Sequence, residues 1–209
     1  MNIDNKKFEI TDIAHKKYPF LHRIRALRDV GPTVKAGDWG GFVEGEWNLS
    51  QEDPTSWIFH DAISANAACV ESGAILRDEA VACGEARVQE MAIMAGHARA
   101  EDHAVVNGAR VEGSARVSSH GMAFSISPSK FPVVSGGSIV HGMVSGNVLL
   151  TGQAVVLGDE KIANDAIDRL VITEVGRRIE RGPGRDQLVP SAQYFGRNKP
   201  RQKHKEAER

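Results

Sequence analysis

The sequence predicts an all-β fold, a parallel β-helix in which short strands wind into a three-sided tube. Three observations predict it. Alanine recurs every six residues through the middle of the chain, and after one five-residue step the period resumes. Most of these alanines are followed two places later by a second core-type residue, such as Val70 or Leu76. A six-residue period does not keep alanine on one face of an α-helix, whereas a fixed short period is typical of a solenoid. The alanines are Ala62, Ala68, Ala74, Ala80, Ala86, Ala92, Ala98, Ala104, Ala109 and Ala115.

Each six-residue repeat is interpreted as one short strand and one corner. In the Ala-x-Val triplet the first and third side chains point the same way, toward the inside of the tube. The next three residues are polar, as at 77–79, and turn the corner. Three repeats close a coil of about eighteen residues, and coils stack roughly 4.8 Å apart. The repeats alone give too few coils for a stable solenoid, so flanking regions must add to it.

The chain divides along its length by composition and turn signals. A non-repetitive first region has strand-like alternation, and a later segment with two prolines interrupts the repeat. The expected parts are an N-terminal capping segment at 1–60, a β-helix at 61–158 with a loop excursion at 118–137, and a C-terminal extension at 159–209. Within this extension, residues 170–172 are expected to form one more strand. The basic segment 197–209 holds almost nothing able to enter a core and is expected to be a disordered tail.

Composition narrows the functional classes. The net charge of −1 argues against strong attraction of the whole molecule to nucleic acid or membrane, although the basic tail allows a weak, salt-sensitive nucleic-acid contact. No stretch has the length of a membrane span, and the first residues lack a signal-peptide core. Cys69 and Cys83 do not have a metal or redox spacing. We therefore expect a soluble cytoplasmic protein with reduced thiols and no membrane contact.

The repeats resemble those of the hexapeptide-repeat proteins, as at 88–92 and 111–115. That resemblance implies a left-handed winding. A closer resemblance, covering about residues 8–117, is to the YdcK-like hexapeptide proteins of bacteria, phages and prophages. It is carried by four blocks in order, Val34-Lys35-Ala36-Gly37, Gly40-Gly41-Phe42-Val43, Asn48-Leu49-Ser50 and Trp57-Ile58. Members of that group are often labelled transferases, by similarity of fold alone.

Histidines are the candidate catalytic residues. Hexapeptide acyltransferases, which this chain resembles in fold, use a histidine as general base beside a groove between the subunits of a trimer. The candidates are His97, His103, His120 and His141. His120 is preferred because it adjoins the loop excursion, whereas His97 and His103 fall at corners where a polar residue is expected anyway. Their spacing does not suggest a zinc site, and no nucleophile triad or phosphate loop is present in the sequence.

Apolar residues at outward positions form two predicted stripes. Ile63 and Val81 lie one coil apart on one face, and Ile75 and Ile93 lie one coil apart on another. Exposed stripes of this kind are normally covered. Two interpretations stay open: residues 1–40 or the loop excursion cover a stripe within the chain, or the stripes form the interface of a homo-oligomer, most simply a trimer with parallel axes.

Four arginines occupy the outward position in later coils: Arg87, Arg99, Arg110 and Arg116. Arg99 and Arg116 are expected nearly to stack. Together the four guanidinium groups form a candidate binding set for the phosphate of a coenzyme, a nucleotide or RNA. The alternative is that they pair with acidic residues at the corners, such as Glu85, Glu101, Asp102 and Glu112.

The leading hypothesis is a non-enzymatic β-solenoid interaction protein, associated with a phage or prophage, that binds a partner macromolecule and needs no cofactor. One alternative is an acyltransferase that uses coenzyme A and His120. Another is a phage-encoded inhibitor that binds a host defence protein through the arginines or the loop 118–137. The motivation for the first is a strong scaffold pattern without a convergent set of catalytic residues.

Overall fold

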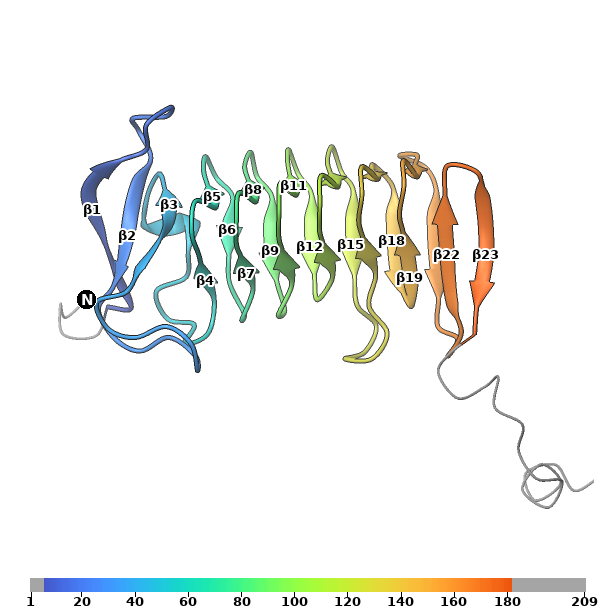
Figure 1. Ribbon diagram of the computed structural model, residues 1–209, viewed down its shortest axis with the longest axis horizontal. Coiled ribbons are helices and arrows are strands. Elements are labelled where there is room, and N and C mark those ends of the chain that lie inside the picture. Colours follow the sequence, from blue (N-terminus) through green and yellow to red (C-terminus); the bar gives the residue numbers. More distant parts are fainter. Residues whose placement is uncertain (1–5, 182–209) are drawn as a thin grey trace, which may run out of the picture.

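Short parallel strands stack along one axis into three sheets, and the chain winds from sheet to sheet in about seven coils (Figure 1). The computed structural model describes residues 6–181 and confirms the all-β solenoid. Within that range the only helical element is a 3-10 turn, η2 (Glu46–Asn48). Across the described residues, no helix has the length and apolar character needed to cross a membrane. The expected basic tail 197–209 lies outside the described residues.

Neighbouring strands within a sheet come mostly from successive coils, and the order of the strands follows the axis of the stack. Sheet 1 contains β1 (Phe8–Ala14), β2 (His22–Ala26), β3 (Trp39–Val43), β5 (Ile63–Ser64), β8 (Val81–Ala82), β11 (Arg99–Ala100), β14 (Arg116–Val117), β17 (Ile139–Val140) and β20 (Val155–Val156). Sheet 2 contains β23 (Gly176–Glu180), β22 (Arg169–Thr173), β19 (Val148–Leu150), β16 (Val133–Val134), β13 (Arg110–Val111), β10 (Ile93–Met94), β7 (Ile75–Leu76) and β4 (Trp57–Ile58). Sheet 3 contains β21 (Lys161–Asn164), β18 (Met143–Gly146), β15 (Met122–Phe124), β12 (Val105–Asn107), β9 (Arg87–Gln89) and β6 (Cys69–Val70).

The interior of each coil is filled by one side chain from each sheet and by small residues at the corners. In the coil of β8, β9 and β10 the inward residues are Ala82, Val88 and Met94, all fully buried. The large methionine stands in the same coil as a small alanine, as close packing of this interior requires. The repeating alanines are at the corners and are 0–1% exposed. The predicted inward direction of these positions is confirmed.

Polar corners are tied to the next coil by side-chain caps on backbone N–H groups. Asp78 Oδ2 accepts a hydrogen bond from the backbone N of Gly96 at 3.0 Å, and Asn66 Oδ1 accepts one from Gly84 at 3.2 Å. Asp78 has a φ of 62° and Asn66 of 57°, in the left-handed region that Asn and Asp tolerate better than most residues. Gly84 has a φ of 72°, and a Cβ there would lie 2.8 Å from the backbone N of Asp102. Glycine is therefore required at this corner.

The five-residue step is absorbed by a shorter corner. After β12, a single left-handed residue, Gly108 with a φ of 61°, leads into β13. One coil earlier, the same corner uses two left-handed residues in succession, Glu90 and Met91. Pairing stays in register across the step, since Arg110 pairs with both Ile93 and Val133. The predicted tighter turn is confirmed.

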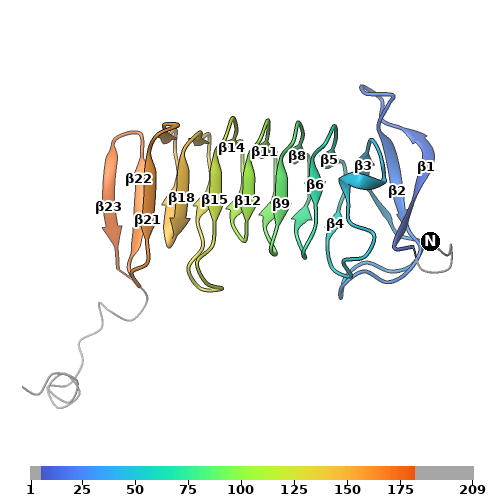
Figure 2. The same ribbon diagram turned by 180° about the vertical axis from the view of Figure 1, so that it is seen from behind.

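Three expected boundaries are corrected by the strand pairing. The first coil begins before residue 61, because β3 pairs in parallel with β5 and β4 with β7. The last coil extends beyond residue 158, because β21 and β22 continue sheets 3 and 2 in parallel. The excursion is also shorter than 118–137, because β15 keeps its place between β12 and β18 and only 125–132 projects from the stack (Figure 1 and Figure 2). The sequence around these strands does not follow the six-residue repeat, so the pattern does not predict them. They form because their backbone groups pair with those of the neighbouring coil.

A carboxylate fixes the long connection before β4 to the stack. Asp53 accepts hydrogen bonds from the backbone N–H groups of Gly73 at 2.7 Å, Thr55 at 2.9 Å and Ser56 at 3.2 Å. Burial is the largest single influence on Asp53 and raises its pKa. The hydrogen bonds together outweigh burial and lower the pKa to about 2.

This shift predicts a loss of stability in acid. A folded-state pKa below the unfolded value of 3.8 contributes stability that is present above pH 3.8 and is lost as the pH falls toward about 2. We expect the wild-type free energy of unfolding to fall more steeply between pH 4 and pH 2 than that of Asp53→Asn. Urea unfolding at each pH measures both. Parallel pH profiles of the two proteins would contradict the prediction.

Candidate functional site

The four predicted arginines are distributed over three sheets. Arg99 and Arg116 are neighbours in sheet 1, as expected from the sequence. Both pair with the same carboxylate, that of Glu101, and Arg116 Nε lies 3.3 Å from it. Arg87 belongs to sheet 3 and Arg110 to sheet 2, so the structure does not bring the four together.

Glu101 largely satisfies the arginine pair in sheet 1. Burial lowers the pKa of Arg99, but the hydrogen bond and charge of Glu101 outweigh it and raise that pKa above its usual value. Arg99 and Arg116 therefore pair with an acidic residue, which is the alternative that the sequence left open. Arg110 is exposed, and its ion pair within residues 6–181 is a 4.0 Å contact with Glu112.

The candidate histidines lie at two corners. His97 Nδ1 is 3.3 Å from Glu79 Oε2, and His103 Nδ1 is 3.2 Å from Glu85 Oε2. His120 stacks on His103 with ring centroids 4.9 Å apart. Such a carboxylate orients an imidazole and leaves its other nitrogen directed outward.

His141 Nδ1 lies 3.2 Å from the hydroxyl of Ser118. Burial raises the pKa values of the free Cys69 and Cys83 thiols, which lowers their reactivity at neutral pH. In residues 6–181, no three His, Cys, Asp or Glu side chains are grouped so that they could hold one metal ion.

The two apolar stripes have different surroundings. In sheet 1, Leu21 and Phe42 pack on Ile63, which is only 9% exposed, and Val81 lies half-buried against the same cluster. Leu21, from residues 1–40, therefore covers Ile63 within the chain, whereas Val81 stays half-buried. Ile75 and Ile93 are neighbours in sheet 2 and remain half-buried.

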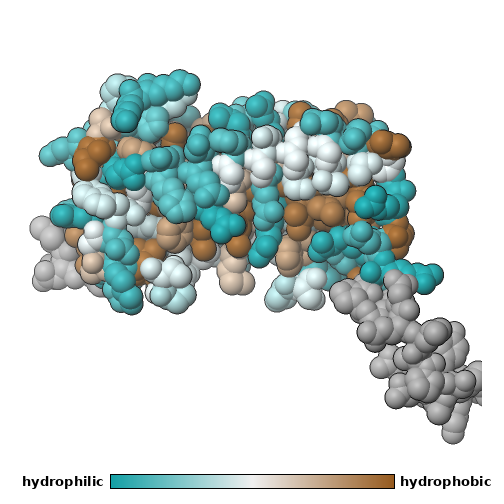
Figure 3. Space-filling model, viewed as in Figure 1, coloured by the Kyte–Doolittle hydropathy of each residue, from teal (hydrophilic) through white to brown (hydrophobic). Residues whose placement is uncertain are grey.

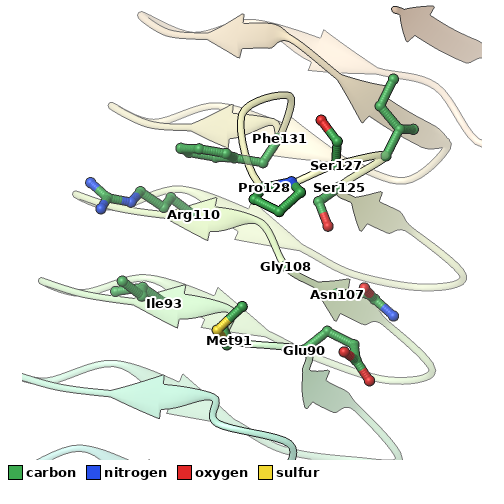
Figure 4. A pocket seen from close by; sticks show the side chains of 11 residues that line it. Glu90, Met91, Ile93, Asn107, Gly108, Arg110, Ser125, Ser127, Pro128 and Phe131 are labelled. Atoms are coloured by element: carbon green, nitrogen blue, oxygen red, sulfur yellow. The ribbon is translucent and has the colours of Figure 1, made fainter.

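A groove lies beside the projecting loop 125–132, which we call the loop groove. It has a volume of about 390 Å³. Figure 4 shows Phe131 beside Arg110, with Ile93 and Met91 on the neighbouring coil. The Arg110 guanidinium lies 5.7 Å from the centre of the Phe131 ring. Glu90, Asn107, Gly108, Ser125, Ile126, Ser127 and Pro128 complete the lining.

The chemistry of the loop groove is that of a binding surface. Met91 is 71% exposed and Ile126 is 46% exposed. Both apolar side chains therefore contact solvent in the groove that Arg110 also lines. The lining has no histidine, cysteine or lysine, and Glu90 supplies its one carboxylate. An exposed apolar surface with an aromatic residue and an arginine is typical of the centre of a protein interface.

The sequence indicates part of this groove. Arg110, Ile93 and the loop excursion are candidates from the pattern, and the structure brings these three together. The pattern does not single out Met91 or Phe131. A signal is present at Met91, because a large apolar residue stands in a corner where the repeat predicts a polar one.

Comparisons of the chain with protein-family models, with curated proteins and with solved structures find no match. Its function is therefore inferred from the geometry of the chain itself.

Proposed function

We propose that the chain is a non-enzymatic β-solenoid interaction protein that binds a partner macromolecule through the loop groove. The observation that carries the proposal is the exposed apolar surface around Met91 and Phe131, placed beside the exposed guanidinium of Arg110. The strand that carries Arg110 is fixed by backbone pairing on both sides, so this part of the surface is held in one shape. A rigid surface loses little conformational entropy on binding.

The finer parts of the proposal depend on the sequence. We propose a left-handed winding and membership of the YdcK-like group, supported by the motif blocks between Val34 and Ile58. Association with a phage or prophage is proposed from that resemblance, and a cytoplasmic location from the spacing of the two cysteines in the sequence. A homo-oligomer, most simply a trimer, is supported by the half-buried Ile75 and Ile93. Hydrophobic side chains also gather in a band along the coils toward the C-terminal end (Figure 3).

Loss of the groove's aromatic and cationic groups should abolish partner capture. We expect Phe131→Ala combined with Arg110→Glu to reduce recovery of the main partner by about tenfold or more, because such residues dominate interface energetics. Capture from host lysate on immobilised protein, measured by quantitative mass spectrometry, tests this.

The matched control is Val155→Ala, since Val155 is 49% exposed at an outward position of β20, away from the loop groove. The proposal fails if the groove variant keeps the partner or if Val155→Ala loses it equally. A captured host defence protein would favour the inhibitor hypothesis.

A second candidate function is acyl transfer from coenzyme A, favoured by the aligned Glu85, His103 and His120. A carboxylate behind one imidazole is the arrangement that orients a general base. Thermal stabilisation by coenzyme A that is lost in His120→Ala would support this candidate over the interaction protein.

A further inference from the structure

The connection between β1 and β2 folds back over the outward face of sheet 1. This hairpin tip, residues 15–21, stands above the stack at the N-terminal end (Figure 1). Leu21 at its base is 1% exposed and packs on Phe42 and Ile63. The tip is therefore anchored to the coil that it covers.

Internal hydrogen bonds give the tip a fixed shape. His15 Nδ1 accepts hydrogen bonds from the backbone N–H groups of Lys17 at 3.2 Å and Tyr18 at 3.1 Å. The imidazole also stacks on Tyr18 and meets the edge of Phe42, with centroids 5.3 and 4.7 Å apart. A tip ordered before binding loses little entropy when a ligand arrives.

Hollows lie on both sides of the tip. The larger one, of about 640 Å³, lies between residues 13–18 of the hairpin and the outward face of sheet 1. A smaller one of about 180 Å³ lies toward Phe20 and Leu21. Both are lined by Tyr18, Ile63, Val81 and Arg99. We call the two together the hairpin groove. Because the two hollows share these lining residues, they form one continuous groove. A groove of this kind suits a linear ligand that runs from one hollow into the other.

The lining of the hairpin groove favours a polypeptide over a nucleic acid. Lys16 and Lys17 are exposed and form no ion pair with any residue in 6–181. On the sheet side, the lining includes the carboxylates of Asp61, which pairs with Arg23, and of Glu79. Both carboxylates have a basic partner, since Glu79 lies 3.3 Å from His97. The half-buried Val81 on the sheet side suits an aliphatic side chain, which a peptide carries and a phosphate backbone does not.

We propose that the hairpin groove binds an extended acidic–apolar peptide segment of a partner protein. In an extended segment, alternate side chains point to opposite sides. Its apolar side chains contact Val81, and its carboxylates face Lys16 and Lys17. This site is separate from the loop groove and does not depend on the function proposed there.

Fluorescence anisotropy with three labelled probes tests the proposal on the full chain. The probes are an eight-residue peptide of alternating leucine and aspartate, its counterpart with lysine for aspartate, and an oligoadenylate of eight nucleotides. We expect saturable binding of the acidic peptide alone. Lys16→Glu combined with Lys17→Glu should weaken it by about tenfold or more, because a repulsive pair replaces an attractive one.

Lys161→Glu is the matched control, because Lys161 is exposed on sheet 3, outside the hairpin groove. Absence of saturable binding, equal binding of the lysine peptide or the oligoadenylate, or equal weakening by Lys161→Glu would each overturn the proposal. Phe131→Ala with Arg110→Glu should leave peptide binding unchanged. Failure at the hairpin groove and failure at the loop groove are thus distinguishable.

Discussion

Enlarging an inward alanine should destabilise the solenoid strongly. We expect Ala82→Leu to lower the free energy of unfolding by about 3 kcal/mol, because the fully buried site has no space for three further carbons. Met94 occupies the same coil interior and is also fully buried. Its replacement by alanine should cost about 3 kcal/mol through the cavity that it leaves. Urea unfolding followed by circular dichroism measures both values.

The double variant Ala82→Leu/Met94→Ala separates overpacking from general damage. If the two side chains share one interior, the added leucine fills the cavity left by methionine. The double variant should then be about 2 kcal/mol more stable than the sum of the single effects predicts. Strict additivity would contradict volume compensation within a coil.

Truncating the anchor of the hairpin tip is the second change with a large expected effect. Leu21→Ala should lower the free energy of unfolding by about 3 kcal/mol, because Leu21 is 1% exposed and packs on Phe42 and Ile63. The tip should also become a site of rapid cleavage. Chemical unfolding and limited proteolysis followed by mass spectrometry measure these effects.

The adjacent Phe20 provides the control, because it is 53% exposed. Phe20→Ala should change stability by less than about 1 kcal/mol and should not open the tip to protease. Equal losses in the two variants would mean that Leu21 is not the anchor.

Much of the stack could be predicted because a solenoid repeats one local rule. The period of alanine identifies the repeat, and the spacing of eighteen residues correctly pairs Ile63 with Val81 and Ile75 with Ile93. Arg99 and Arg116 are seventeen positions apart, yet they still pair, because the tight turn at Gly108 restores the register.

The irregular coils could not be assigned from the pattern alone. Residues 122–124 carry a small Ala123 at the inward position and lie in a segment rich in serine and glycine, so the pattern predicts a loop there. Pairing on both sides, with β12 and with β18, makes them a strand. A backbone between two formed strands gains hydrogen bonds whatever its side chains prefer.

The candidate sites show the same division. The sequence by itself determined the tube, its inward residues and the outward positions of Arg99, Arg110 and Ile63, because these follow from periods of two and six along one chain. Only the tertiary structure decided that Arg110 meets Phe131 and that the hairpin tip covers Ile63. Each of those contacts joins a repeating coil to a loop outside the repeat. The path of such a loop depends on its own turns and packing, which the period of the sequence does not encode.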